Sequence, residues 1–106
     1  MEEDLIYQGT KFKAYVNLDP IGNLSMKDYD FEIDVYTDLS AKKLVFKKEE
    51  CISLDDNTYV VAVDSSQLGL GYLKLRVRAM IPDRQIDGHR PEVVVFTLRK
   101  RLVKGD

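Results

Sequence analysis

Apolar and polar residues alternate along most of this chain, which is the pattern of β-strands with one buried and one exposed face. The alternation is regular in residues 10–18, 29–35 and 72–81, and shorter apolar stretches lie at 44–46 and 59–63. No stretch has the spacing of an amphipathic helix, so the pattern predicts an all-β fold. The residues that it places in the core include Phe31, Ile33, Val61, Leu75 and Val77.

Turn-forming residues separate the predicted strands at short intervals. Clusters rich in Asp, Asn, Gly or Pro occur at 19–23, 55–57 and 82–91, and Gly69 and Gly71 allow a tight turn before the next strand. Short strands with turns between them are typical of a β-sandwich. We therefore expect an immunoglobulin-like sandwich of about seven antiparallel strands, with a small open β-barrel as the alternative.

The last predicted strand, from Glu92 to about Leu102, departs from simple alternation. It contains the uninterrupted apolar run Val93-Val94-Val95-Phe96. Such a run is typical of a strand that is buried on both faces. A β-bulge that exchanges the two faces of the strand would produce a similar pattern. The run therefore predicts either burial on both faces for part of the strand or a bulge.

Length and composition indicate an ordinary globular domain. The chain has 106 residues, of which 44% are hydrophobic and 32% are charged, and we expect one domain over residues 1–106. The net charge of −2 argues against nucleic acid as a partner. The acidic N-terminus does not resemble a secretory signal, and no apolar run approaches the ~20 residues of a membrane helix. We therefore expect no membrane partner and a cytoplasmic product.

Residues that commonly carry catalysis or bind metals are scarce. His89 is the only histidine and lies in a turn-forming stretch, so we expect it to be exposed. Cys51 is the only cysteine, which excludes an intrachain disulfide and favours a buried structural thiol. Gly69 and Gly71 precede a strand rather than a helix, unlike the glycines of a phosphate-binding loop. We expect no catalytic, cofactor-binding or metal-binding site, and hence a protein that is not an enzyme.

Two rows of charge, one acidic and one basic, lie on predicted outward faces of two strands. An acidic row could bind a cation, but more often it is a solvated face or one side of a cross-strand charge ladder. If the two strands are neighbours in one sheet, the rows form a ladder within the domain; if the strands are apart, each row is free to meet a partner. The rows, which together form a candidate interaction surface, are Asp30, Glu32 and Asp34, and Lys74, Arg76 and Arg78.

Three segments combine turns with the strands that flank them. Residues 6–12 place a glycine directly before a strand. Residues 57–73 run from an alternating strand through a small polar turn into Leu-Gly and Gly-Tyr-Leu, and residues 82–93 form a hairpin loop that resumes as a strand. With these segments the chain resembles the N-terminal domain of phage baseplate upper proteins and related tail modules.

The resemblance implies a non-catalytic virion structural protein, whose β-sandwich packs against copies of itself or against neighbouring tail and baseplate proteins. Such a protein would be found in the virion, or in the host cytoplasm before assembly. Its partners would be other virion or tail proteins, and self-association is one form of such packing. The alternative function is a carbohydrate- or surface-binding adhesion module that uses loop tips at one end of the sandwich, with Tyr15 and Tyr36 as anchors.

Overall fold

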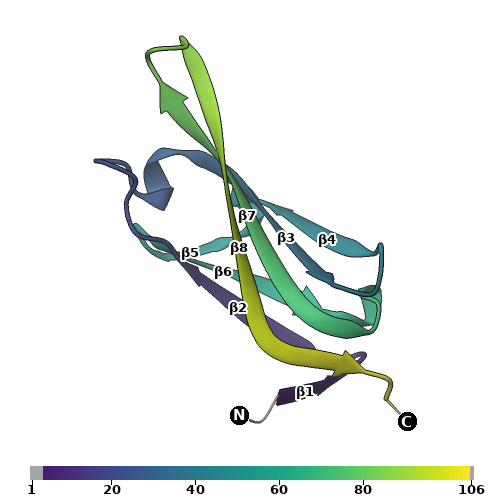
Figure 1. The fold of residues 1–106 in the computed structure, drawn as a ribbon. Helices are drawn as coiled ribbons and strands as arrows, with labels where there is room; N and C mark the ends of the chain where they lie inside the picture. Colours follow the sequence, from purple (N-terminus) through teal and green to yellow (C-terminus); the bar gives the residue numbers. More distant parts are fainter. Residues whose placement is uncertain (1–3, 106) are drawn as a thin grey trace.

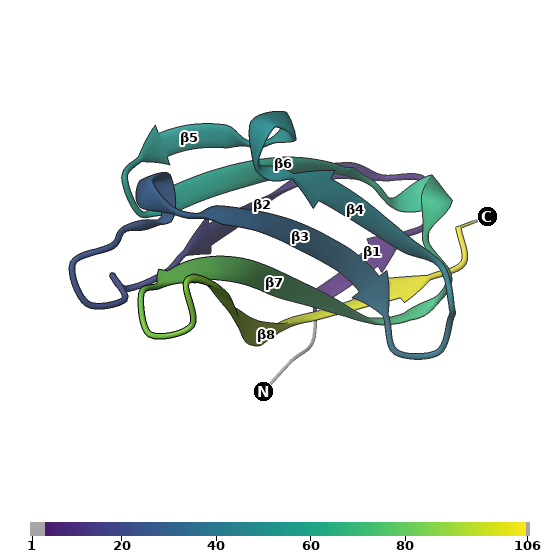
Figure 2. The same cartoon turned by 90° about the horizontal axis from the view of Figure 1, so that it is seen from above.

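The strands of the computed structural model, which describes residues 4–105, form two sheets that pack against each other (Figure 1; Figure 2). The larger sheet has five strands, in the order β1 (Asp4–Tyr7), β8 (Gly88–Val103), β7 (Gly71–Asp83), β3 (Asp30–Thr37) and β4 (Lys43–Lys47). The smaller sheet has three strands, in the order β2 (Lys11–Asn17), β6 (Thr58–Asp64) and β5 (Ile52–Asp55). Three single-turn 3-10 helices join the strands, namely η1 (Met26–Asp28), η2 (Lys48–Glu50) and η3 (Ser65–Gln67).

This architecture confirms the predicted all-β sandwich. The described residues form eight strands rather than about seven, and one pairing is parallel. β1 runs parallel to the end of β8, from Asp4 opposite Lys100 to Tyr7 opposite Val103. The other strand pairs are antiparallel. Within the described residues, no helix is long and apolar enough to cross a membrane.

The core lies between the two sheets and is filled by the residues that the alternation turns inward. Phe31 is its largest fully buried side chain, and its ring meets the ring of Tyr59 edge to face, with 4.9 Å between the ring centroids. The side chain of Lys48 closes one end of the sandwich, because its Nζ donates hydrogen bonds to the carbonyl oxygens of Lys27 and Tyr29. The five residues predicted for the core are all buried, namely Phe31, Ile33, Val61, Leu75 and Val77.

The β7–β8 hairpin extends well beyond the rest of the domain as an arm (Figure 1). The prediction of a loop over residues 82–91 was wrong. The two strands continue until a short turn at 84–87, and Pro82 lies opposite His89. The partner strand β3 begins at Asp30, opposite Met80, so the arm has no third strand beside it. Proline is tolerated at such edges because its missing N–H breaks no ladder.

Gly71, the first residue of β7, makes the tight turn that the sequence predicts at the start of this strand. Gly71 has a φ of 128°, which L side chains rarely adopt. A Cβ at Gly71 would lie 2.5 Å from Oδ1 of Asp38. That oxygen accepts a hydrogen bond from the backbone N–H of Tyr72 at 2.9 Å. The glycine therefore lets the loop after β3 bind the start of β7, which fixes the register of the two strands.

Candidate interaction surfaces

The acidic and basic rows lie on neighbouring strands of one sheet. In the antiparallel pairing of β3 with β7, Glu32 is opposite Arg78 and Asp34 is opposite Arg76. Of the two arrangements that the sequence left open, the structure therefore has the internal ladder. The charges of its central residues are compensated within the domain, which reduces what they can offer to a partner.

Asp34 is the centre of this charge ladder. Arg76 donates from Nε to Oδ2 of Asp34 at 2.8 Å, and Arg78 donates from Nε to Oδ2 and from Nη2 to Oδ1, both at 2.9 Å. Arg78 also reaches Oε2 of Glu32 at 2.8 Å through Nη2. The guanidinium of Arg76 lies over the ring of Tyr36, 5.5 Å from its centroid. Two arginines and a tyrosine thus hold one carboxylate in a fixed position.

The expectation that Asp34 is an exposed residue was wrong, since its side chain is 0% exposed. The two arginine side chains fold over the carboxylate and exclude water from it. Burial alone would raise the pKa of Asp34, but hydrogen bonds from Arg78 and Arg76 outweigh that effect and hold the pKa below its ordinary value. Asp34 in turn raises the pKa of Arg78. The group is therefore a charge-assisted network that favours the ionised forms.

The two outermost members of the predicted rows lie outside this network. Asp30 is opposite Met80, and its carboxylate accepts a hydrogen bond from the N–H of Phe31. Lys74 is opposite Tyr36. Among residues 4–105, no three His, Cys, Asp or Glu side chains come together as metal ligands would. The carboxylates of Glu32 and Asp34 are occupied by arginine instead.

The valines of β8 form an exposed apolar strip, which corrects the expectation that this run is buried. Val93 is 55% exposed, Val94 38% and Val95 54%. Val93 and Val95 lie opposite Arg78 and Arg76 on the outer face, and Val94 lies opposite Val77 on the inner face. The register shift in the β7–β8 ladder falls between Tyr72 and Lys74, beyond the valines, so a bulge does not explain the run either.

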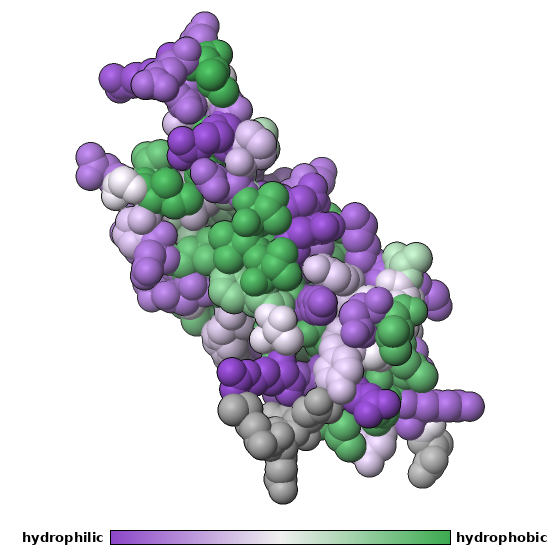
Figure 3. All heavy atoms as spheres, in the orientation of Figure 1, coloured by the Kyte–Doolittle hydropathy of each residue, from purple (hydrophilic) through white to green (hydrophobic). Residues whose placement is uncertain are grey.

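β8 is paired on one side only over most of its length, and no other sheet of the described chain covers the outer face on which Val93 and Val95 lie. β1 covers β8 from Lys100 to Val103, and residues 88–98 of that edge border no other strand of the described chain. Figure 3 shows hydrophobic side chains gathered in the middle of the face across which β8 runs. We call residues 88–98 of β8 the open edge. A long apolar edge of this kind is a template for pairing with another strand.

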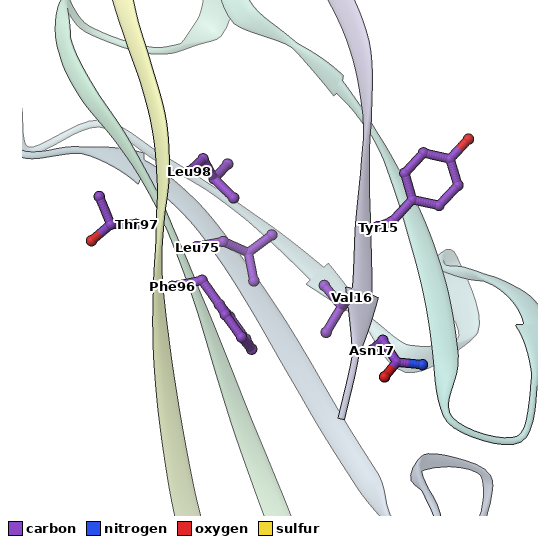
Figure 4. A pocket seen from close by; sticks show the side chains of 7 residues that line it. All are labelled: Tyr15, Val16, Asn17, Leu75, Phe96, Thr97 and Leu98. Carbon is purple, nitrogen blue, oxygen red and sulfur yellow. The ribbon is translucent and has the colours of Figure 1, made fainter. Parts of the chain in front are cut away.

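A shallow groove lies beside the open edge, between β8 and the free edge of β2 (Figure 4). It holds about 310 Å³. Leu75, Phe96 and Leu98 of the larger sheet face Val16 across it, as Figure 4 shows. The smaller sheet has three strands against five, so it does not fully cover the inner face of β8. The groove extends the apolar surface of the open edge.

The only cysteine and the only histidine of the sequence lie in different parts of the fold. Cys51 is half-buried after η2, and its Sγ lies 3.3 Å from the carbonyl oxygen of Lys47. Burial, together with Glu50 and Glu49, raises the pKa of the Cys51 thiol to about 11, whereas a reactive cysteine needs a lowered pKa. His89 is exposed on the arm, opposite Pro82. The thiol therefore has the properties of a structural residue.

No family model matches the chain, and no curated protein or solved structure is significantly similar to it. The surface that stands out in the structure, the open edge, was not among the residues that the sequence proposed. Its signal was nevertheless visible in the run Val93-Val94-Val95. The pattern predicted that this run is buried, but it did not predict that the domain itself leaves the run exposed.

Proposed function

We propose that this protein is a non-catalytic assembly module that acts through protein–protein contacts. The observation that carries the proposal is the exposed strip Val93–Val95 on an open strand edge. Apolar residues at an unpaired edge bring a risk of aggregation, and proteins normally protect such edges with lysine, proline or bulges. Residues 92–98 include five apolar residues and neither lysine nor proline, which is explained if the edge is covered by a partner in the working state.

The resemblance to phage baseplate upper proteins suggests where this assembly takes place. We infer a role as a structural protein of a phage or prophage tail or baseplate, with other virion or tail proteins as partners. The charge ladder around Asp34 supports this role because it holds the outer face beside the valines in a fixed arrangement. Arg76 and Arg78 are opposite Val95 and Val93, so the network adjoins the proposed contact.

Fractionation of phage or tail particles from a host that encodes the chain tests this proposal. We expect the protein to comigrate with particles in a density gradient and the double variant Val93→Glu/Val95→Glu to stay in the soluble fractions. The matched control is Val93→Thr/Val95→Thr, which keeps the β-branched shape without adding charge and should comigrate. A wild-type protein absent from every particle fraction would overturn the tail assignment.

A second candidate is a carbohydrate- or surface-binding adhesion module. The observation that favours it is Tyr15, which is 63% exposed and lies on the rim of the groove. Tyr36, the other predicted anchor, lies under Arg76 and is committed to the charge ladder. Binding to immobilised glycans that is lost in Tyr15→Ala and kept in Val93→Glu/Val95→Glu would favour the adhesion module over the assembly module.

A further inference from the structure

We propose that the open edge is covered by a second copy of this chain, with the two β8 strands paired antiparallel about a two-fold axis at Val94. This inference rests on the proposed function and names the partner at the same surface. The two five-stranded sheets would join into one continuous sheet, with the two copies of β8 at its centre. Closed two-fold dimers of this isologous type are the commonest homo-oligomers.

The sequence of β8 supports this arrangement because it is that of a central strand. Val93 and Val95 are exposed on the outer face, and Val94 and Phe96 face the other side of the sheet. Within one copy this apolar stretch lies at an edge, which is a template for pairing with another strand. Pairing with a second β8 gives each strand a neighbour on both sides and places Val93 and Val95 of one copy beside those of the other.

The register that the symmetry requires is also the register that suits these residues. Residues on the same face must be opposite each other, so the axis has to pass through a residue, and Val94 is the middle one of the three exposed valines on the open edge. Val93 is then opposite the second copy's Val95, and Glu92 is opposite its Phe96. Like charges directly opposite each other would destabilise antiparallel pairing. In this register no such pair occurs between residues 90 and 98.

The remaining free edges of the described chain are poorer templates. β4 ends in Lys43 and Lys47, and β2 carries Lys11 and Lys13, the residue type that most often blocks pairing at an edge. β1 and β5 have only four residues each, and β5 has an irregular register between Ser53 and Asp55. The open edge of β8 is longer than any of these and contains no lysine. Pro91 lacks an N–H, so we expect the ladder to be continuous from Glu92 to Phe96.

Sedimentation equilibrium of the purified protein tests the pairing. The wild type should be a dimer, and Val93→Glu/Val95→Glu should raise its dissociation constant by at least about 100-fold, because the introduced carboxylates would face each other across the axis. In the monomer the same carboxylates lie opposite Arg78 and Arg76, so we expect the double variant to fold and to keep the melting temperature of the wild-type domain. Val93→Thr/Val95→Thr should remain a dimer. A wild type that is monomeric at every concentration up to its solubility limit overturns the inference.

Disulfide trapping tests the register. In a Cys51→Ser background, Val94→Cys places two thiols opposite each other on the axis, within the 4.4–6.8 Å between Cα atoms that a disulfide needs. Mild oxidation should convert this variant to a covalent dimer. The matched control is Ile52→Cys on β5, which is 59% exposed and should crosslink slowly. Equal rates for the two variants would contradict the proposed pairing.

The two proposals fail in different ways. A wild type that is monomeric in solution but joins tail particles through the valines would leave the assembly function standing and overturn self-pairing, with a strand of another protein on the open edge. A wild type that dimerises through Val94 but never joins particles would keep the pairing and overturn the tail role.

Discussion

Arg78 donates two hydrogen bonds to Asp34, from Nε to Oδ2 and from Nη2 to Oδ1, each at 2.9 Å. This side-by-side geometry is the strongest form of an arginine–carboxylate contact. It is combined with complete burial of the Asp34 side chain on a face where the neighbouring carboxylates of Asp30 and Glu32 are reached by water. Asp34 is therefore the residue of the charge ladder whose removal should matter most.

Replacing Asp34 by asparagine should destabilise the domain by about 2–3 kcal/mol, because two partly exposed guanidinium groups lose their shared counter-charge. Chemical denaturation measures the change. The matched control is Asp30→Asn on the same strand, which lies outside the network and should change stability by no more than about 0.5 kcal/mol. Equal losses in the two variants would show that the network contributes no special stability.

The contribution of Asp34 should also be visible in the pH dependence of the stability of the domain. The pKa of Asp34 is lower in the folded state than in the unfolded chain, so its contribution is fully present above the unfolded value of about 3.9. The contribution is lost as the pH falls through the folded value. Hydrogen bonds from Ser25 and Ser66 lower the pKa values of Asp28 and Asp64, so the contributions of these carboxylates to stability change with pH in the same direction. Asp34→Asn should therefore lose less stability than the wild type between pH 5 and acid; parallel curves would contradict this.

Truncating Phe31 to alanine should cost about 3–5 kcal/mol, since the ring is fully buried between Tyr29 and Tyr59. Thermal or urea unfolding measures the loss. Tyr15→Ala, at an exposed position, provides the comparison and should cost less than about 1 kcal/mol. A small loss at Phe31 would mean that the inward face of β3 has been assigned to the wrong residues.

Alanine at Gly71 should cost about 1–3 kcal/mol, because the positive φ is strained for an L side chain and the new Cβ would meet Asp38. The same substitution at Gly88 meets nothing closer than 3.8 Å and should leave stability unchanged or slightly raised. Unfolding curves of the two variants, recorded together, make the comparison. If Gly88→Ala proved the more harmful change, the tight turn before β7 would not be where the strain lies.

The alternation of single residues was sufficient to predict the strands and the core. Positions such as Phe31 and Val77 are determined by local pattern and by the need of one face to be buried. The extent of the β7–β8 arm was not predictable in this way, because Pro82 and Pro91 read as loop residues unless one knows that no third strand lies beside them.

Burial of Asp34 also depends on pairing that the sequence does not specify. The residue becomes buried because β3 and β7 are neighbours and both arginines fold over it, whereas Asp30, two pleats away, stays exposed. The exposure of Val93–Val95 is the reverse case. Their pattern predicted burial on both faces, but the smaller sheet lies on the inner side only and does not extend fully beneath β8.

Hydrogen exchange of the β8 backbone amides, followed by NMR as a function of protein concentration, tests most directly whether the open edge is a contact surface. Alternate amides between Glu92 and Phe96 point away from β7, as antiparallel geometry requires. Pairing with a second strand predicts that these amides become protected as concentration rises in the wild type, and remain fast in Val93→Glu/Val95→Glu. Exchange that is fast at every concentration, and identical in the two proteins, would contradict the role of β8 as the site of self-assembly.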